Sequence, residues 1–154
     1  MKERYFETIM LIERLHYLSG DVVKAEIDRR RIFDISNVQC FILYNIGKDE
    51  MVVGEIANRG YYLGSNVSYN LKKLVKYGYI IQEKDIHDKR ASKVRLSEKG
   101  LELYETLDKI FTHQAESLHR EGLGEQNMAD TLKSLRKLET FWTLVTNYGL
   151  PEKH

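Results

Sequence analysis

Cysteine and proline are almost missing from this chain of 154 residues, which contains one of each, Cys40 and Pro151. A single cysteine can form neither an internal disulfide nor a zinc–cysteine cage. The sequence therefore excludes the disulfide-rich secreted class and the zinc ribbons, and it favours a reducing, cytoplasmic location. Because the one proline lies near the C-terminal end, no interior break is imposed on long helices.

Long apolar runs are missing as well. No stretch approaches the roughly 18 apolar residues of a membrane helix, and residues 1–7 mix charged with apolar side chains. We therefore expect neither a membrane partner nor a targeting segment. Hydrophobic residues nevertheless make up 42% of the chain, which is enough for a packed core, and the length predicts a single domain over residues 1–154.

The charges become informative when they are mapped along the chain. The formal net charge is only +1, but the segment 59–95 holds nine basic and three acidic residues, a charge of +6, and the remainder carries −5. A basic middle between acidic arms suits a protein that attracts a polyanion at one place. A lysine-rich helix face that is merely solvated is the alternative that charge alone leaves open.

Apolar periodicity predicts a mainly α chain with a small β wing. Apolar positions recur every three or four residues in long segments, whereas residues 79–84 and 92–96 alternate as strands do. Ser36 and Gln39 have the spacing of a capping box, and Gly47 ends the helix that follows. The predicted order is a long helix over about 5–27, a short helix over 36–46, a strand over 51–53, one or two helical turns over 54–58, an amphipathic helix over 65–78, a hairpin over 79–96, and two long helices after Ser97 and Gly124.

The amphipathic helix predicts a DNA-recognition element. One side of its helical wheel is apolar and suited to packing, with Val67, Leu71, Leu74 and Val75. The other side offers hydrogen-bonding groups for base edges and cations for phosphates, as a helix in the major groove requires. The residues of this helix that we expect to contact DNA are Ser65, Asn66, Ser68, Tyr69, Asn70, Lys72, Lys73 and Lys76.

The charged hairpin completes the order of elements in a winged helix-turn-helix. Its tip holds His87, Asp88, Lys89 and Arg90, which we also expect to contact DNA. Arg90 can enter a narrow minor groove, where the negative potential is strongest, and Asp88 can orient its guanidinium. A surface ion pair between Asp88 and Arg90 with no role in binding is the open alternative.

The terminal helices carry more apolar surface than so small a central unit can cover. We therefore expect them, over residues 1–32 and 98–150, to pack across a dimer, with the DNA-binding part over 36–97. In the last helix the apolar stripe consists of Met128, Leu132, Leu135, Leu138, Trp142 and Val145, widened by Phe141 and Leu144.

The hairpin also resembles a family signature. Residues 88–90 (Asp-Lys-Arg) and 94–100 (Val-Arg-Leu-Ser-Glu-Lys-Gly) are similar to the Asp-x-Arg and Val-x-Leu-Thr-x-x-Gly wing of the MarR family of bacterial transcriptional regulators, with Ser97 in place of threonine. The likeness in helical order extends over almost the whole chain. The resemblance implies a homodimer that binds double-stranded DNA at a pseudo-palindromic operator, usually as a repressor, and that responds to a small-molecule effector.

The predicted recognition helix departs from the family pattern. Family members commonly carry Ser-x-x-Thr-Arg there, whereas residues 64–73 read Gly-Ser-Asn-Val-Ser-Tyr-Asn-Leu-Lys-Lys, without arginine. No base preference therefore carries over. Residues 59–64, Arg-Gly-Tyr-Tyr-Leu-Gly, are similar to a subgroup of MarR-like regulators tied to cell-envelope remodelling through L,D-transpeptidase control.

The resemblance also implies an effector pocket where the first helix, the second helix and the helix after the wing meet. By helix position, its candidates are His16, Phe41, Tyr44 and Phe111. Aromatic residues at helical spacing are commonly core residues, so core packing is the alternative interpretation of the same four positions.

A redox site and a metal site are the remaining candidates. Some MarR relatives sense oxidants through cysteine, but nothing near Cys40 in the sequence indicates a stabilised thiolate, which favours a packing role. His113, Glu116 and His119 share one helix, but the two histidines are six residues apart and do not face the same way. We therefore expect no metal and no cofactor.

The leading interpretation is a dimeric DNA-binding repressor that responds to a small effector. A winged-helix module that binds protein and a nonspecific architectural DNA-binding protein are the alternatives. A DNA affinity that falls steeply with salt separates the protein-binding module from the other two. An enzyme is not expected, because the sequence offers no glycine-rich phosphate loop and no nucleophile with a base at a recognisable spacing.

Overall fold

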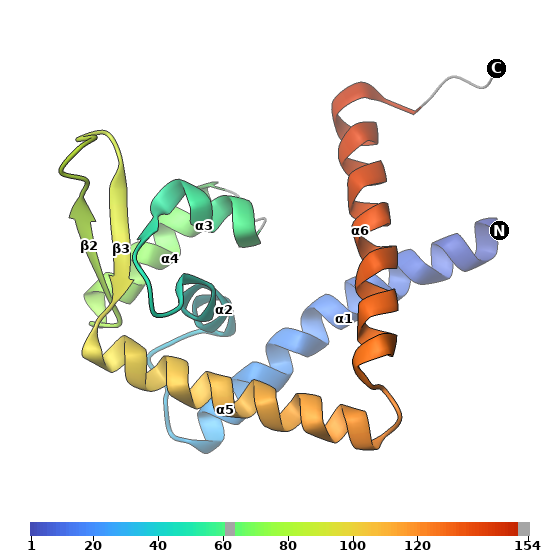
Figure 1. Ribbon diagram of the computed structural model, residues 1–154, viewed down its shortest axis with the longest axis horizontal. Helices are drawn as coiled ribbons and strands as arrows, with labels where there is room; N and C mark the ends of the chain where they lie inside the picture. The colour runs from blue at the N-terminus through green and yellow to red at the C-terminus, as the bar shows by residue number, and fades with distance from the viewer. Residues whose placement is uncertain (61–63, 151–154) are drawn as a thin grey trace. The chain divides into compact units, whose positions relative to one another are not determined.

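The computed structural model describes residues 1–60 and 64–150. The chain divides into two compact units, Met1–Ile110 and Phe111–His154, and the boundary falls inside one long helix. The predicted class, mainly α with a small β wing, is confirmed (Figure 1). The elements are α1 (Lys2–Arg29), α2 (Asn37–Ile46), β1 (Met51–Val52), α3 (Val53–Gly60), α4 (Gly64–Lys76), β2 (Ile80–Lys84), β3 (Ser92–Leu96), α5 (Glu98–Arg120) and α6 (Glu125–Tyr148).

Both ends of α2 follow from local sequence signals. The Ser36 hydroxyl accepts a hydrogen bond from the Gln39 backbone N–H at 3.2 Å, and the Gln39 side-chain oxygen accepts one from the Ser36 N–H at 3.0 Å. This reciprocal pair is the predicted capping box. The helix ends at Gly47, whose φ of +70° lies in the region that favours glycine.

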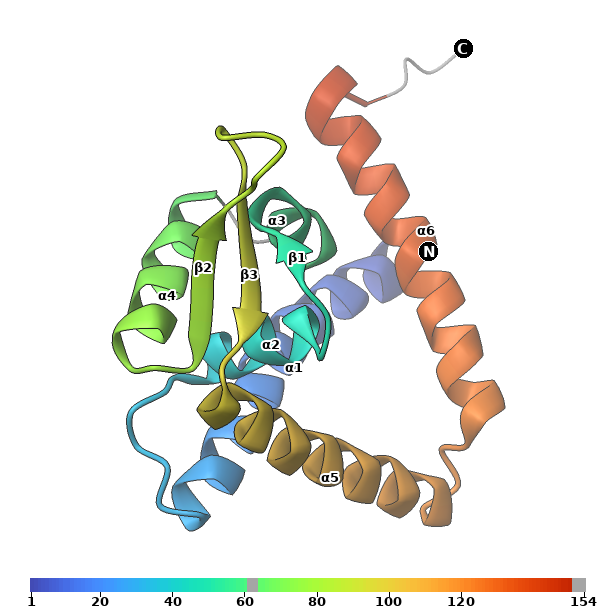
Figure 2. The same cartoon turned by 60° about the vertical axis from the view of Figure 1, so that its left-hand side comes forward.

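The three strands form one antiparallel sheet in the order β1-β3-β2. Ile80 pairs with Leu96 and Lys84 with Ser92, which makes β2 and β3 the predicted hairpin. Figure 2 shows its loop extending beyond the neighbouring ends of α3 and α4. The strand β1 is shorter than predicted, because Val53 already begins α3.

The end of α4 leads directly into the hairpin. The Gly78 N–H donates to the Val75 carbonyl at 3.0 Å, the Tyr79 N–H donates to the Leu74 carbonyl at 2.9 Å, and Gly78 has a φ of +79°. These bonds define a Schellman motif. Because the Tyr79 backbone is held in this turn, β2 begins at Ile80, one residue later than predicted.

The core of the first unit lies between its short helices, the sheet and the first turns of α5. From α1 only the C-terminal half contributes buried side chains, namely Val23 and Ile27. Other side chains buried in this core include Ile42, Leu43, Ile56, Leu71, Leu74, Val94 and Leu107. The N-terminal half of α1 instead exposes a row of large apolar residues, which includes Phe6, Met10, Leu11, Leu15 and Leu18.

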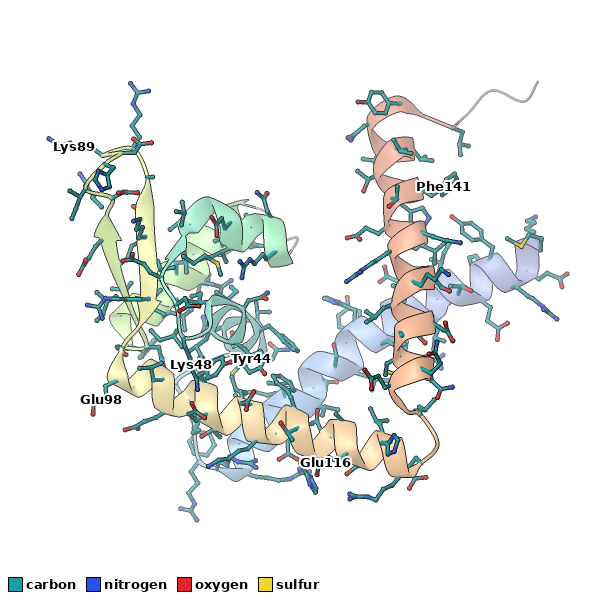
Figure 3. The ribbon with its side chains drawn as sticks, in the orientation of Figure 1. Tyr44, Lys48, Lys89, Glu98, Glu116 and Phe141 are labelled. Atoms are coloured by element: carbon teal, nitrogen blue, oxygen red, sulfur yellow. The ribbon has the colours of Figure 1, made fainter. Side chains whose placement is uncertain are left out.

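The second unit contains the last turns of α5 and the helix α6. No residue of α6 is buried. Five of the predicted stripe residues are exposed, namely Met128, Leu132, Leu135, Phe141 and Leu144, and Figure 3 labels Phe141. Across residues 1–60 and 64–150, the helices are too short or too polar to span a membrane.

Candidate nucleic-acid interface

The helix α4 has one buried and one exposed side. Val67, Leu71 and Leu74 are buried in the core, as the helical wheel predicts. Val75, predicted to pack with them, is 42% exposed because it lies at the edge of the packing side. The exposed side carries Asn66, Ser68, Tyr69, Lys72 and Lys76, and Lys73 is half-buried beside them.

One predicted DNA contact on this helix is wrong. Asn70 is buried, with 9% of its surface exposed. Its Oδ1 accepts a hydrogen bond from Gln39 Nε2 at 3.1 Å, and its Nδ2 donates to the Asn66 carbonyl at 2.7 Å. Because both ends of its amide are satisfied inside the protein, Asn70 joins α4 to α2 and is not available to read a base.

Two lysines of α4 are supported by neighbouring aromatic rings. Lys73 Nζ lies 5.7 Å from the centre of the Tyr69 ring, and Lys76 Nζ lies 5.9 Å from the centre of the Tyr77 ring. A cation over a ring face gains a modest electrostatic attraction and loses mobility. Tyr69, which is 61% exposed, therefore presents a hydroxyl and an adjacent positive charge at the same surface.

The tip of the hairpin is ordered by two aspartates. Asp85 Oδ1 accepts the His87 N–H at 2.9 Å, and Asp88 Oδ1 accepts the Arg90 N–H at 3.0 Å. The Asp88 carboxylate thus holds the Arg90 backbone and shapes the turn, and its predicted role in orienting the Arg90 guanidinium stays a prediction. The side chains of His87, Lys89 and Arg90 are all exposed, and Figure 3 labels Lys89 at the outer end of the loop.

Ion pairs stiffen the stem below this tip. Lys93 Nζ lies 3.7 Å from a carboxylate oxygen of Glu50 and 3.7 Å from one of Asp85. The hydrogen bond from the His87 backbone, together with the charge of Lys93, holds the pKa of Asp85 below its ordinary value. The carboxylate that shapes the turn therefore stays ionised at neutral pH.

Sequence reasoning missed one exposed residue of the tip. Ile86 is 91% exposed, although it is a large apolar side chain, and it sits between the turn-forming Asp85 and His87. The sequence signal that could have identified it is an isoleucine in a loop whose other residues are mostly charged.

Part of the predicted interface lies outside the described residues. The backbone of α4 begins at Gly64, one residue before the predicted start of this helix, and the side chain of Ser65 is not described. Residues 61–63, which belong to the stretch similar to the L,D-transpeptidase subgroup, are not described either. That subgroup stays a prediction.

The predicted effector pocket is partly accounted for by contacts within the first unit. The Tyr44 ring stacks on Tyr104 with centroids 4.9 Å apart, and its hydroxyl donates to Asp108 Oδ1 at 2.7 Å (Tyr44 is labelled in Figure 3). The hydrogen bond to the Asp108 carboxylate and burial raise the pKa of Tyr44 to about 12. Tyr44 thus links α2 to α5 as a neutral phenol.

The other three pocket candidates have different surroundings. His16 is exposed on α1 and makes an edge contact with Tyr17 at 5.4 Å between centroids. Phe41 is half-buried in the first unit, and Phe111 is half-buried at the start of the second. The effector pocket they were predicted to form stays a prediction.

A groove of about 670 Å³ lies inside the second unit, at the bend between α5 and α6. Its lining combines apolar side chains with Glu116, His119, Arg120 and Glu125. None of the four effector candidates lines it. Within the described residues, no group of three or more histidine, cysteine or acidic side chains is arranged to hold a metal ion.

Cys40 lies fully inside the core of the first unit. Burial raises the pKa of its thiol to about 12. A thiol that stays protonated at neutral pH is a poor nucleophile and a slow target for oxidants. The predicted packing role of Cys40 is consistent with this environment.

Known proteins share both the sequence and the fold of this chain. Residues 35–100 match the family described as the winged helix DNA-binding domain. The exopolysaccharide II synthesis transcriptional activator ExpG of Rhizobium meliloti (strain 1021) is 34% identical over 146 residues, which cover 95% of this chain and 75% of that protein.

Solved structures have the same arrangement of elements. A MarR transcriptional regulator from Methanosarcina mazei Go1 superposes with a TM-score of 0.72 at 21% identity, covering 90% of this chain and 99% of that chain. MepR of S. aureus, solved as a DNA complex, superposes with a TM-score of 0.66 at 22% identity, covering 88% of this chain and 94% of that chain. At such low identities these likenesses establish the fold.

Proposed function

Because the chain belongs to the MarR family of winged-helix DNA-binding transcriptional regulators, we propose that it binds a pseudo-palindromic operator as a homodimer. The observation that carries this proposal is the division of α4 into a buried apolar side and an exposed polar and basic side. An exposed helix face of this composition matches the major groove in size and chemistry. Family members are transcriptional regulators, and we propose no catalytic role and a cytoplasmic location.

The two parts of the interface have different tasks in this proposal. The polar residues of α4 read base edges, and its lysines neutralise phosphates. Arg90 and His87 of the wing tip enter the adjacent minor groove, where Ile86 contacts the apolar walls formed by the sugars. The proposed contacts on α4 are Ser65, Asn66, Ser68, Tyr69, Lys72, Lys73 and Lys76, and those on the wing are Ile86, His87, Lys89 and Arg90.

The exposed apolar surfaces support the homodimer. The N-terminal half of α1 exposes large apolar side chains such as Phe6 and Leu15, and α6 exposes others such as Leu132 and Leu144. A soluble protein does not leave such continuous stripes in water without cost. A second copy of the chain covers both stripes in the proposed dimer, and two-fold symmetry then matches the symmetry of the operator.

The direction of regulation and the effector also belong to the proposal. We propose repression, because occlusion of a promoter requires only the DNA-binding surface, and release by a small molecule that binds near Tyr44. The relative with 34% identity is named as an activator. Transcription in vitro from a template carrying the operator distinguishes repression from activation, since a repressor lowers the yield of transcript and an activator raises it.

Binding to DNA from the region upstream of the chain's own gene tests the proposal, against unrelated DNA of equal length and at two salt concentrations. We expect preference for the upstream fragment and an affinity that falls steeply with salt. Equal affinity for both fragments would instead indicate an architectural role. Absence of binding to either fragment would favour a module that binds protein.

A further inference from the structure

Three segments of the first unit meet at one carboxylate. Asp34, in the loop between α1 and α2, accepts a hydrogen bond from the Tyr79 hydroxyl at 2.5 Å and another from Lys99 Nζ at 2.7 Å. Tyr79 lies between the end of α4 and the start of β2, and Lys99 lies in the first turn of α5. We call Asp34, Tyr79 and Lys99 the clamp. It joins the recognition helix, the wing and α5.

Lys99 makes two further contacts at the end of α4. Its ammonium donates to the Tyr77 carbonyl at 2.8 Å and lies 4.2 Å from the centre of the Tyr79 ring. The Tyr77 carbonyl belongs to the turn that ends α4, so Lys99 holds that turn directly as well as through Asp34. Lys99 of α5 is therefore linked to the end of the recognition helix by three contacts, namely with Asp34, with the Tyr77 carbonyl and with the Tyr79 ring.

The backbone at Tyr79 also lies close to the start of α5. The Ser97 N–H donates to the Tyr79 carbonyl at 3.0 Å, and the Gly100 N–H donates to the Ser97 hydroxyl at 3.1 Å. A Cβ atom at Gly100 would lie 2.0 Å from the Tyr79 carbonyl oxygen, so only glycine allows this approach. Figure 3 shows Glu98, the first residue of α5, directly below the base of the hairpin.

At neutral pH the Asp34 carboxylate of the clamp is ionised, and the Tyr79 phenol is neutral and donates to it. Partial burial opposes the ionisation of Asp34, but the hydrogen bonds from Lys99 and Tyr79 outweigh it and hold its pKa below the ordinary value. Burial and the bond to Asp34 raise the pKa of Tyr79, which keeps the phenol as a donor. Charge-assisted bonds of this kind are about twice as strong as neutral ones.

Within the part of the chain that the structure describes, the hydrogen bonds and the ring contact of the clamp involve none of the proposed DNA contacts. Two other side-chain bridges to α5 in this unit, Tyr44 to Asp108 and Lys48 to Glu105 at 2.6 Å, begin in or just after α2. At the end of α4, the hydroxyl of Ser97, the residue before α5, also donates to the Gly78 carbonyl. The clamp is therefore placed to control the angle between α4 and α5. Since α5 continues into the part proposed above to form the dimer, we expect that angle to affect how far apart two recognition helices stand in the proposed dimer.

We propose that Asp34 is a positioning residue that fixes the recognition helix against α5 and so determines which half-site spacing the dimer accepts. This inference rests on the proposed function. It adds a determinant of operator geometry that lies outside the DNA-contacting surface.

Spacing variants of an operator test this role. The probe is the duplex that the wild-type protein selects from a random-sequence library, together with versions lengthened at the centre by one and by two base pairs. Asp34→Asn keeps the shape and an acceptor for Tyr79 but loses the charge that holds Lys99. Tyr79→Phe removes the other bond and keeps the ring. The matched control is Asp28→Asn, which changes the net charge equally but affects only the Lys24 pair within α1.

We expect Asp34→Asn and Tyr79→Phe to lower the affinity for the selected duplex by about 2- to 30-fold, the range for residues that couple through packing. The ratio of affinities between the selected and the lengthened duplexes should shrink in both variants and stay unchanged in Asp28→Asn. A loss of affinity by the same factor on every duplex would overturn the proposal, because it would mean that the clamp only stabilises the fold.

A distance measurement separates this proposal from the proposed function. Nitroxides at Lys72→Cys on α4 and Glu102→Cys on α5 report the angle within one chain, with labelled chains diluted in unlabelled protein. Cys40 can stay in place because it is buried and protonated. We expect a narrow distance distribution in the wild type and in Asp28→Asn, and a broader one in Asp34→Asn. A distance distribution in Asp34→Asn as narrow as that of the wild type would overturn the proposed role of Asp34, even if the wild-type protein prefers one operator spacing. If the wild type prefers no spacing, the proposed function fails, and the width of the distribution still shows whether Asp34 holds α4 against α5.

Discussion

Gln39 of α2 donates a hydrogen bond from its side-chain amide to Oδ1 of Asn70 in α4, at 3.1 Å, and both side chains are buried. The same Gln39 closes the capping box of α2 through its Oε1. One glutamine thus fixes the start of α2 and the position of the recognition helix. Its two contacts explain why a polar residue of α4 faces the core.

Asn70→Ala should lower the free energy of unfolding by about 1–3 kcal/mol, because it leaves the buried Gln39 amide without its acceptor. Urea unfolding followed by circular dichroism measures this change. At a temperature where the variant stays folded, its DNA affinity should remain close to that of the wild type. Ser68→Ala, an exposed neighbour on the same helix, is the control and should leave stability unchanged. Lost affinity at full stability would restore Asn70 as a base reader.

Lys73→Ala should weaken binding to all DNA sequences by a similar factor and reduce the slope of log affinity against log salt by about one unit, because one phosphate contact is lost. Titration at four salt concentrations on two unrelated duplexes measures both effects. Lys109→Ala removes the same charge from an exposed position on α5 and should leave the slope unchanged. A change confined to one base position would make Lys73 a base reader.

Arg90→Ala should cost about 1–3 kcal/mol of operator binding, because the guanidinium is expected in the minor groove. Sedimentation should show that the variant is still a dimer. Arg95→Ala, which removes an equal charge from the exposed stem of the hairpin and breaks its pair with Glu83, is the control. Equal affinities for wild type and Arg90→Ala would exclude a contact between this side chain and DNA.

Ile86→Ser should reduce operator affinity by about 1 kcal/mol without altering the salt slope, because the contact it removes is apolar and releases no counterions. Ile86→Leu keeps the apolar surface and should bind like the wild type. The pair is compared in the same titrations as Lys73→Ala. Wild-type affinity in the serine variant would show that the exposed isoleucine has no part in binding.

The sequence predicts those features that depend on residues close together in the chain. The capping box at Ser36, the helix end at Gly47 and the alternation in the hairpin each involve side chains or backbone groups within a few positions, and each is confirmed. The amphipathic pattern of α4 likewise indicates which side packs, because a helix repeats every 3.6 residues.

Features that depend on distant partners escape the sequence. Asn70 looks like a base reader on the helical wheel, but its partner Gln39 lies 31 residues earlier. Asp34 has no local pattern at all, and its partners Tyr79 and Lys99 lie 45 and 65 residues later.

The central claim, a two-fold symmetric dimer that places α4 in the major groove and the wing in the minor groove, is tested most directly by hydroxyl-radical footprinting on the selected duplex. We expect two symmetric sets of protected sugars whose centres are about one helical turn apart or a multiple of it, with a wing protection outside each set that disappears in Arg90→Ala. A single, asymmetric footprint, or protection without defined positions, would contradict the claim.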